Sequence, residues 1–594
     1  MESNTHLKLA ARGIFVGMVT ALAFLGTVGF DSTLWAQNPV PLINQPLVPD
    51  TVIPGGLGFI LTVNGTGFVA VSTVEWNGNA LTTHFVDESR LTGSVPAKDI
   101  AQNGAASVTV VNPGPGGGSS GTIFFPISAP TAIVTLGRTD FGPTGVWDIY
   151  LVTADFNGDG KLDLAVTEFI SGQVRILLGN GDGTFQSFQT YPACHAHGLA
   201  SGDFNGDGIL DLVVADAGCG QVSILLGNGN GTFKESGSFS TGPGAQFAPY
   251  SVAVGDFNSD GKLDLVTANE LNNKTSVLLG NGDGTFQSHV DYDTGVDSRQ
   301  VAVGDFNGDG RLDLAVSSSE GVSILWGNGD GTFQGQTLYP LATTDNPYMV
   351  IADLNGDNKL DLAVANTAGS VSILLGNGNG TFQGAVPYAT GGFSATVAAA
   401  DFNGDGKLDL ACGNYYDANI AILLGNGDGT FQQHVNYPAG SGARGLVAAD
   451  FNGDGRLDLA VANQFIGSLS VFLQPVADTT PPFITMVVHP MTLWPPNGKM
   501  VPVTVFGTIT DTGSGVNASS AAYAVKDEYG EIQPKGAIHL SSGGSYSFTI
   551  MLQASRRGAD LDGRRYTITV RAKDKAGNRG SKTRVVTVPH DQRD

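Results

Sequence analysis

A nine-residue phrase rich in side-chain oxygens recurs seven times along the chain. In its first copy, Asp155, Asn157, Asp159 and Asp163 occupy positions 1, 3, 5 and 9. A hard cation such as calcium takes six to eight oxygen ligands, and a loop that curls round it offers alternate side chains and a backbone carbonyl. Gly160, at position 6, allows the left-handed turn that brings position 9 back toward the ion. The spacing therefore predicts one calcium site in each copy, with the carbonyl supplied by position 7.

The copies follow one another at intervals of 48, 53, 49, 48, 48 and 49 residues. Ordinary surface turns also use Asp and Asn, but that alternative does not explain three Asp and one Asn at identical offsets in all seven copies. Ser259 replaces the glycine at position 4 and Leu354 the phenylalanine at position 2, while Asn358 at position 6 weakens the fifth site without abolishing its turn. The residues predicted to hold up to seven calcium ions are Asp155, Asn157, Asp159, Lys161, Asp163, Asp203, Asn205, Asp207, Ile209, Asp211, Asp256, Asn258, Asp260, Lys262, Asp264, Asp305, Asn307, Asp309, Arg311, Asp313, Asp353, Asn355, Asp357, Lys359, Asp361, Asp401, Asn403, Asp405, Lys407, Asp409, Asp450, Asn452, Asp454, Arg456 and Asp458.

The elements around each loop are predicted to be strands. An EF-hand needs an acid at position 12, where the first copy has Val166, and helices on both sides. The loop instead runs into a short β-type apolar segment. Six copies are followed by a second phrase, Gly-Asn-Gly-Asp/Asn-Gly-Thr-Phe, beginning at residues 179, 227, 280, 327, 376 and 425. This phrase predicts a hairpin turn between a third and a fourth strand. Its Asp182-type residues are an alternative metal site, but Asn230 and Asn379 replace them, which favours a turn.

A fixed period of this size indicates a repeat architecture. The Asp-Phe-Asn-Gly-Asp-Gly-Lys-Leu-Asp-Leu segments resemble the FG-GAP (VCBS-type) repeats of bacterial surface proteins and integrin α-subunit propellers. The resemblance covers about 131–475, and implies that each repeat is one four-stranded blade whose acidic loop binds calcium. The expected fold is all-β, with a seven-bladed β-propeller flanked by two immunoglobulin-like β-sandwiches. The seventh copy lacks the second phrase, so a strand at 132–136 is expected to complete the last blade and close the ring.

The regions outside the repeats divide into three. Residues 1–36 are expected to be an export signal, with a retained membrane anchor as the alternative. Residues 38–128 predict a small β-sandwich and resemble an IPT/TIG domain through the segments 63–68, 74–78 and 112–118. We expect it to act as a spacer, and Trp76 to belong to its core rather than to a binding surface. Residues 478–590 follow a stiff Pro-containing linker and resemble bacterial immunoglobulin-like surface modules through 493–499 and 572–578.

The formal charge of −24 is concentrated in the repeats. The seven loops hold 21 Asp against six Lys or Arg side chains, a balance of −15, so folding and metal binding are expected to be coupled. Such a surface disfavours nucleic acid as a partner. Apart from the N-terminal apolar run, no segment is long enough to span a bilayer. The expected export signal and the resemblance to bacterial surface proteins imply a bacterial protein that is secreted or held at the cell surface, and its oligomeric state is not predicted.

Three cysteines are too few for a disulfide scaffold. Cys194 and Cys219 bracket the second acidic loop, and both are expected on the face opposite the ion, where a bridged pair and two free thiols are both compatible with the sequence. Cys412 lies inside an apolar strand and is expected to be a buried free thiol.

The loops opposite the predicted calcium sites differ from copy to copy, as binding loops on a repeated scaffold do. These loops also contain Phe247 and Phe393. His195 and His197 could alternatively coordinate a metal ion as a pair. Aromatic and arginine side chains on one face suit sugar stacking or protein capture. The leading hypothesis is a calcium-binding adhesion or carbohydrate/protein-binding module, and not an enzyme. A polysaccharide-active enzyme and a purely structural surface component are the alternatives. The predicted ligand-binding residues are Trp147, Tyr150, His195, His197, Tyr250, Arg299, Tyr348, Tyr415, Tyr416 and Arg444.

Overall fold

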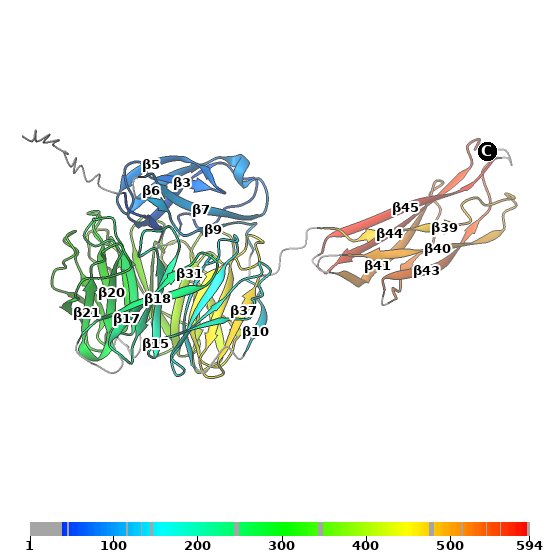
Figure 1. Ribbon diagram of the computed structural model, residues 1–594. Helices are drawn as coiled ribbons and strands as arrows, with labels where there is room; N and C mark the ends of the chain where they lie inside the picture. The colour runs from blue at the N-terminus through cyan, green and yellow to red at the C-terminus, as the bar shows by residue number, and fades with distance from the viewer. Residues whose placement is uncertain are drawn as a thin grey trace, which may run out of the picture.

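The computed structural model describes residues 38–590, apart from 44–46, 115–116, 132–133, 143–146, 243–248, 342–347, 475–479, 512–514, 542, 559 and 576. The expected export signal therefore lies outside the described residues. Figure 1 shows a large block of sheets from the side, an N-terminal sandwich lying on one end of it, and a C-terminal sandwich standing apart. Within the described part of the chain, no helix has the length and apolar character needed to cross a membrane.

The ring consists of seven four-stranded antiparallel sheets, each named here from its inner to its outer strand. A short 3-10 turn, η2 (Glu270–Asn272), joins two strands of the third sheet. The strands are β11 (Asp148–Ala154), β12 (Asp163–Glu168), β13 (Gln173–Leu177) and β14 (Gln189–Pro192); β15 (Ala196–Gly202), β16 (Asp211–Asp216), β17 (Gln221–Gly227) and β18 (Phe233–Ser240); β19 (Ser251–Gly255), β20 (Asp264–Asn269), β21 (Lys274–Leu278) and β22 (Val290–Asp293); β23 (Gln300–Gly304), β24 (Asp313–Ser318), β25 (Gly321–Leu325) and β26 (Thr337–Pro340); β27 (Met349–Ala352), β28 (Asp361–Asn366), β29 (Ser370–Leu374) and β30 (Val386–Ala389); β31 (Ser394–Ala400), β32 (Asp409–Asn414), β33 (Asn419–Leu423) and β34 (Val435–Pro438); and β35 (Ala443–Ala449), β36 (Asp458–Asn463), β37 (Ser468–Leu473) and β10 (Gly137–Phe141).

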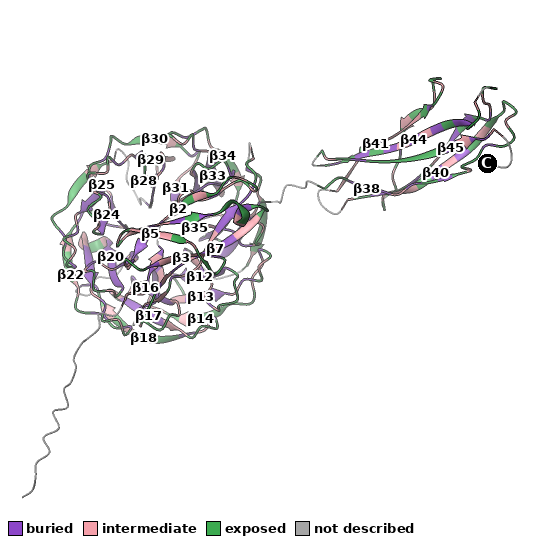
Figure 2. Cartoon of the chain, turned by 90° about the horizontal axis from the view of Figure 1, so that it is seen from above, coloured by how far each residue is buried: buried purple, intermediate pink, exposed green. Residues whose placement is uncertain are grey.

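The ring is closed at both its inner and its outer circumference. Each inner strand contacts the inner strand of the next sheet, and β35 contacts β11 across the closure. Figure 2 shows these sheets around a central axis. The N-terminal strand β10 pairs with β37 from Gly137–Leu473 to Phe141–Leu469, so the first and last repeats share one sheet. The architecture is the all-β propeller that the repeats predicted.

The closing strand lies a few residues later than predicted. The sequence pointed to 132–136, because this stretch is apolar, whereas β10 spans Gly137–Phe141 and is mostly exposed. Residues 132–133 lie outside the described chain; Val134 is buried and Leu136 packs on the core of the last two sheets. The apolar residues therefore anchor the approach to the strand, while the strand itself is an outer edge that needs few apolar side chains.

Burial explains why the sequence identifies the second strand of each sheet so clearly. All six residues of β16 are buried, as are all six of β12, β20, β24, β28, β32 and β36. A short continuous apolar run is typical of a strand buried on both faces. Between sheets, Phe156 of the first acidic loop packs edge-to-face on Phe233 of the next sheet, with ring centroids 5.6 Å apart. Phe204–Phe286 and Phe257–Phe333 repeat this contact, so the phenylalanine that ends the second phrase packs between neighbouring sheets.

Cys194 and Cys219 form a disulfide with Cα atoms 5.8 Å apart. It joins the segment before β15 to the turn between β16 and β17, so it lies at the opposite end of β16 from the acidic loop. The bridged alternative is therefore the one the structure contains. Cys412 is buried and free, and burial raises the pKa of its thiol to about 12.

Replacing both bridging cysteines by serine is expected to lower the free energy of unfolding of the ring by about 3 kcal/mol. The bridge closes a segment with a sequence separation of 25 residues, and a loop of that order restricts the unfolded chain by roughly this amount. Urea unfolding of Cys194→Ser/Cys219→Ser against the parent protein measures the difference. Cys412→Ser is the control for removing a thiol, and an unfolding midpoint unaffected by removal of the bridge contradicts the expectation.

The N-terminal sandwich has two sheets around one core. The first contains β1 (Leu42–Ile43), β2 (Phe59–Thr66), β6 (Arg90–Val95) and β5 (Thr82–Asp87), and the second contains β4 (Asn79–Ala80), β3 (Thr73–Trp76), β7 (Gly104–Asn112), β8 (Gly118–Ser119) and β9 (Ile123–Ile127). A 3-10 turn, η1 (Ala97–Ile100), connects β6 and β7. Trp76 is 2% exposed and packs between Phe59 and Phe125, so its predicted core role is confirmed.

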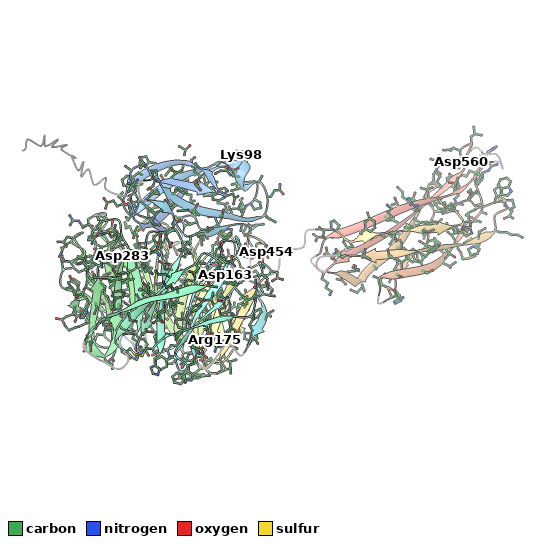
Figure 3. All side chains as sticks on the ribbon, in the orientation of Figure 1. Lys98, Asp163, Arg175, Asp283, Asp454 and Asp560 are labelled. Atoms are coloured by element: carbon green, nitrogen blue, oxygen red, sulfur yellow. A yellow bond between two sulfur atoms is a disulfide. The ribbon has the colours of Figure 1, made fainter. Side chains whose placement is uncertain are left out.

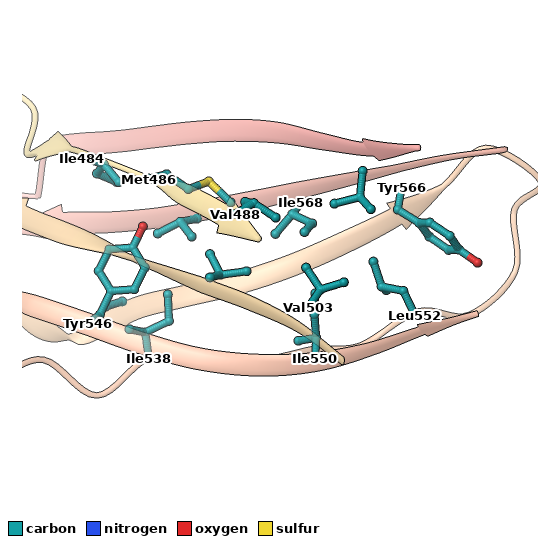
Figure 4. Close-up of a cluster of buried hydrophobic side chains, with 14 of the residues drawn as sticks. Ile484, Met486, Val488, Val503, Ile538, Tyr546, Ile550, Leu552, Tyr566 and Ile568 are labelled. Carbon is teal, nitrogen blue, oxygen red and sulfur yellow. The ribbon is translucent and has the colours of Figure 1, made fainter. Parts of the chain in front are cut away.

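The C-terminal sandwich is also built from two sheets, and Figure 4 shows its core. One sheet contains β38 (Phe483–Ile484), β40 (Met500–Thr510), β39 (Val487–His489) and β43 (Ser545–Gln553); the other contains β42 (Lys535–Ala537), β41 (Val516–Asp527), β44 (Arg564–Asp574) and β45 (Arg579–Val588). Arg564 is buried and donates to both carboxylate oxygens of Asp527. The core consists only of residues from this sandwich.

Candidate functional site

Each acidic loop connects the first and second strands of one sheet. The loop from Asp155 to Asp163, for example, joins β11 to β12. Gly158 and Gly160 have φ values of 73° and 78°, which is the left-handed region expected for this turn. Ser259 and Asn358, which replace these glycines in other copies, adopt φ values of 55° and 61°. The two substitutions therefore leave the turn intact, as the sequence predicted for position 6.

Backbone amides inside each loop donate to the acidic side chains. Asp155 Oδ1 accepts hydrogen bonds from the amides of Gly158 and Asp159, at 2.8 and 3.1 Å, and its Oδ2 accepts one from Gly160 at 2.8 Å. Asn157 Oδ1 accepts from Asp159, and Asp159 Oδ1 accepts from the Lys161 amide. The same pattern recurs in the other copies. These bonds curl the loop around its own oxygen atoms.

The acid at position 9 has a structural role that the spacing did not reveal. Asp163 is fully buried; its Oδ2 accepts from the Phe156 amide at 2.9 Å and its Oδ1 from the Gly179 amide at 2.7 Å. It thus ties the acidic loop to the end of the third strand. All seven position-9 acids are fully buried and make the equivalent pair of bonds, with Gln474 donating in the last sheet.

The three carboxylates of one loop act on one another electrostatically. Burial raises the pKa of Asp163 to about 6, the amides of Gly179 and Phe156 oppose that rise, and the charges of Asp155 and Asp159 add to it. In the sixth copy, burial raises the pKa of Asp409 to about 8, opposed by the Gly425 amide and increased by Asp401 and Asp405. A cation inside the loop would remove this repulsion, so the donor set fits a hard divalent ion.

The position-7 side chains partly balance this charge. Lys161 Nζ lies 3.7 Å from Asp159 Oδ2, and the Lys262–Asp260 and Lys359–Asp357 distances are 3.6 and 3.0 Å. The Lys161 chain also runs along Gly181 of the second phrase. In the described residues, no three His, Cys, Asp or Glu side chains are gathered as a ready metal-ligand group. The three Asp side chains of each loop are of these types, so they do not converge on one centre in this structure, and the calcium sites stay a prediction.

The second phrase forms the predicted turn. Asp182 Oδ1 accepts from the Thr184 amide at 3.0 Å and from its hydroxyl, and these bonds lower the pKa of Asp182. Asn230 makes the same two contacts with Thr232. Because an amide oxygen replaces the carboxylate without changing the turn, the geometry favours the turn over the alternative metal site.

The N-terminal sandwich covers the end of the ring that carries the acidic loops. Asp163 and Asp454 lie toward this sandwich and Arg175 lies toward the other end (Figure 3), and Figure 2 shows β2, β3, β5 and β7 over the middle of the ring. Asp50 Oδ2 accepts from the Asp401 amide at 2.7 Å. Burial, followed by the charge of Asp401, raises the pKa of Asp50 to about 7. The sandwich is therefore docked on the ring rather than held away from it, unlike the spacer that the sequence suggested.

Space remains between the sandwich and the loops. Three cavities of about 140, 240 and 310 Å³ lie at this contact. Their walls include acids of five loops, namely Asp155, Asp203, Asp256, Asp260, Asp305 and Asp353. Each cavity is large enough for several water molecules, so docking of the sandwich does not seal these loops from a dissolved ion.

The predicted ligand-binding residues lie at the opposite end of the ring. They lie just before the inner strands, at the beginning of the inner strands, or in the turns between second and third strands, and contacts connect them into one network. Trp147 stacks on Phe169, which also contacts His195 and His197, at centroid distances of 6.2, 5.2 and 6.1 Å. His197 lies against Tyr250. Phe247 falls outside the described residues.

The second half of the network centres on Arg444. Its guanidinium lies 6.0 Å from the ring centroids of both Tyr250 and Tyr415. The Tyr415 ring contacts Tyr416 at 4.8 Å, and Arg299 lies over Tyr250 at 5.0 Å. Tyr150 and Tyr348 pack together near the axis, with centroids 6.4 Å apart. All ten predicted residues therefore belong to one end of the ring, on the inner strands and turns of several sheets.

Sequence reasoning missed several members of this network. Phe169, Glu270, Gln464 and Phe465 lie in the turns between the second and third strands, as Tyr415 and Tyr416 do. Phe465 contacts Tyr415 and Tyr416 at 4.7 and 6.0 Å. The signal was present in the repeat: Phe169, Glu270, Tyr415 and Gln464 all stand 14 residues after the first Asp of their copies. Aligning the copies on that Asp brings these positions together.

Comparison with known proteins identifies two kinds of domain. The model of the FG-GAP-like repeat matches 155–214, 203–267, 256–316, 305–364, 353–412 and 401–461, and the model of the IPT/TIG domain matches 45–127. No curated protein matches the chain significantly.

Three solved structures illustrate the distant likenesses. BBS1N in complex with ARL6DN is 13% identical, covering 59% of this chain and 98% of its own, with a TM-score of 0.43. An Agrocybe aegerita lectin that recognises non-reducing terminal N-acetylglucosamine is 18% identical, covering 61% and 96%, with a TM-score of 0.36. A putative 6-phosphogluconolactonase from Bacteroides uniformis is 17% identical, covering 53% and 88%, with a TM-score of 0.37. At these values none of them carries an argument about ligand or activity.

Proposed function

The chain belongs to the FG-GAP-like repeat family, whose repeats cover more than half of its length, and we propose that it is a secreted or cell-surface binding module whose seven acidic loops hold calcium. FG-GAP repeats and an IPT/TIG domain are typical of extracellular proteins. Millimolar calcium outside the cell makes even weak loop sites useful. In this proposal the metal stabilises the ring, and the ring presents a ligand-binding surface at its other end.

The observation that carries the calcium proposal is the charge inside each loop. In the first loop, burial raises the pKa of Asp163 and the charges of Asp155 and Asp159 add to that rise, while the position-7 cation pairs with only one of the three carboxylates. Calcium accepts flexible sets of six to eight oxygens, including carboxylate, amide and carbonyl groups, whereas magnesium demands a strict octahedron. Each loop supplies these three oxygen types within nine residues. We propose Asp or Asn oxygens at positions 1, 3, 5 and 9 and the carbonyl at position 7 as the ligands.

Equilibrium dialysis of the metal-free protein against calcium tests this proposal directly. We expect binding to approach seven ions per chain, with the loop containing Asn358 among the last to fill. Asp401→Asn/Asp405→Asn should remove one ion, because both changes fall in one loop. Asp428→Asn, in the neighbouring turn, is the matched control and should remove none. A chain that binds no calcium at millimolar concentration would falsify the metal assignment.

Asp159→Ala is expected to reduce the stabilisation by calcium by about 1 kcal/mol, the contribution of one weak site near saturation. Asp182→Ala should leave the calcium-dependent part unchanged, because Asp182 caps an exposed turn. Thermal shift with and without calcium separates this part from the general cost of each substitution. If both substitutions reduced the calcium-induced thermal shift equally, the calcium site could not be assigned to the acidic loop rather than to the turn.

The ligand of the module is proposed to bind at the end of the ring opposite the loops. The N-terminal sandwich covers the loop end, whereas the opposite end carries exposed aromatic side chains such as Tyr416 and Phe465. A glycan array probed with and without chelator tests adhesion or carbohydrate binding, and calcium-dependent signals are expected. We propose no enzymatic activity, since the sequence has neither a Gly-x-Ser-x-Gly nor a His-Glu-x-x-His motif.

A further inference from the structure

Arg444 is a half-buried cation whose direct partners are neutral. It donates to Gln464 Oε1 at 3.2 Å and to the Tyr250 hydroxyl at 3.5 Å, lies beside the rings of Tyr250 and Tyr415, and also interacts with the Tyr348 hydroxyl. The nearby Arg299 differs, because it forms an ion pair with Glu270. Within the described ranges, no carboxylate lies at ion-pair distance from Arg444. Glu270 acts on Arg444 electrostatically but without an ion-pair contact, so an anionic group placed directly against this partly desolvated guanidinium would be favoured.

Two buried polar atoms beside Arg444 also lack partners. Tyr348 Oη and His197 Nε2 are buried and have no hydrogen-bond partner of good geometry among the described residues. Burial raises the pKa of Tyr348, and the Arg444 charge opposes that rise. His197 Nδ1 faces the Tyr250 carbonyl at 2.8 Å, and since a carbonyl only accepts, Nδ1 carries the proton. Nε2 of the neutral ring is then an acceptor that needs a donor.

A small cavity adjoins Tyr348. Its volume is about 110 Å³, and it is lined by Tyr150, Gln300 and Tyr348, by Gly445 next to Arg444, and by apolar residues such as Leu446. Its volume corresponds to three or four water molecules by their share of the liquid, roughly 30 Å³ each. A carboxylate with an adjacent hydroxyl group fits such a volume, whereas a large apolar side chain does not.

An exposed aromatic platform adjoins Arg444 on its outer side. The Tyr415 ring, which Arg444 approaches, contacts Tyr416, Phe465 and Phe393 with centroid distances of 4.8, 4.7 and 6.0 Å. Tyr416 is 64% exposed and Phe465 is 44% exposed. A cluster of solvent-exposed aromatic side chains beside a cation is typical of a ligand-binding surface.

We propose that Arg444 and this platform bind a hexuronate residue of an acidic glycan, with the guanidinium on the sugar carboxylate and the Tyr416 ring against the sugar face. This inference rests on the proposed binding function and names its ligand class. A hexuronate supplies the group that the site lacks, namely an anion for Arg444. It also has an apolar C–H face for the platform. An acidic peptide supplies the anion, but neither the flat ring nor the adjoining hydroxyl groups.

Titration calorimetry of the full chain with trigalacturonate, at fixed free calcium, tests the proposal. Arg444→Gln keeps the hydrogen-bonding shape but removes the charge, and should weaken binding by about thirtyfold or more, as expected for loss of a charged partner. Tyr416→Ala, at an exposed position, should weaken it by about fivefold. The controls are Arg138→Gln and Phe188→Ala, an arginine and a 43% exposed phenylalanine outside the network, and both should bind as the parent does.

Several outcomes would overturn the inference. Equal binding of neutral galactotriose would show that Arg444 reads no carboxylate. Binding of an oligoglutamate peptide in place of trigalacturonate would assign the surface to proteins. No heat of binding up to about 10 mM trigalacturonate, or losses as large in the two controls, would also reject it. The calcium-induced thermal shift, measured on the same samples, reports the proposed calcium function separately, because Arg444 and Tyr416 lie at the other end of the ring.

Discussion

Removing calcium is expected to lower the melting temperature of the ring by about 10–20 °C. An ion that binds only the folded state stabilises it by RT ln(1 + [L]/Kd), which is about 1 kcal/mol per site when calcium stands several-fold above a weak, extracellular-type Kd. Seven such sites together give about 5–10 kcal/mol. For a unit of this size each kcal/mol corresponds to about 2 °C. Differential scanning calorimetry in calcium and in chelator measures the shift.

The C-terminal sandwich provides an internal control for this experiment. It has a core of its own, and a buried Arg564–Asp527 pair fastens two of its strands. Its transition is expected to stay where it is when calcium is removed. The sequence alone suggested the same independence for the N-terminal sandwich, but its docking on the loops through Asp50 and Asp401 changes that expectation. We expect the N-terminal transition to follow the ring. Equal shifts in all three units, or none in the ring, would contradict the loop assignment.

The repeats made most of the ring predictable from sequence. The acidic loops, the buried second strands and the turns of the second phrase recur at fixed offsets, and the structure confirms each of these elements. Outer strands were harder to place, because strands such as β10 are largely exposed and carry few apolar residues. The pattern therefore marked Val134, which anchors the approach to β10, in place of the strand.

Two features could not be predicted from sequence periodicity: the docking of the N-terminal sandwich on the ring, and the full set of residues in the network at the opposite end. Contacts such as Asp50 with the Asp401 amide join residues 351 positions apart, and no periodicity reports them. The network was half predicted, because Arg444, Tyr250 and the other chosen residues stood out as aromatic or basic in variable loops. Gln464 and Phe465 were missed because they directly follow an apolar strand, so the sequence pattern assigned them to that strand rather than to a binding loop. Physical burial of the position-9 acids was also hidden, since spacing alone does not distinguish a buried carboxylate from an exposed one.

That burial leads to the second large prediction: without metal, the ring should lose on the order of 10 kcal/mol of stability or more as the pH rises from 5 to 8. Burial raises the pKa of Asp163 to about 6, of Asp211, Asp313 and Asp361 to about 7, and of Asp264, Asp409 and Asp458 to about 8. In the unfolded chain these acids titrate near 3.8–3.9. Between the two values the native ring binds more protons than the unfolded chain, so stability falls as the pH rises. One unit per loop, at 1.36 kcal/mol each, already amounts to about 10 kcal/mol.

Calcium should reverse the sign of this dependence. Ligand carboxylates must lose their protons before they hold the ion, so calcium binds more tightly as the pH rises through the same range. Urea unfolding in metal-free and in calcium-containing buffers, at several values from pH 5 to 8, measures both slopes. Asp458→Asn replaces one titrating acid by a neutral group of the same shape, and should flatten the metal-free slope by about one seventh. If the metal-free ring became more stable toward pH 8, the buried acids would be ionised in the folded state without a bound cation. The electrostatic argument for a cation in each loop would then be wrong.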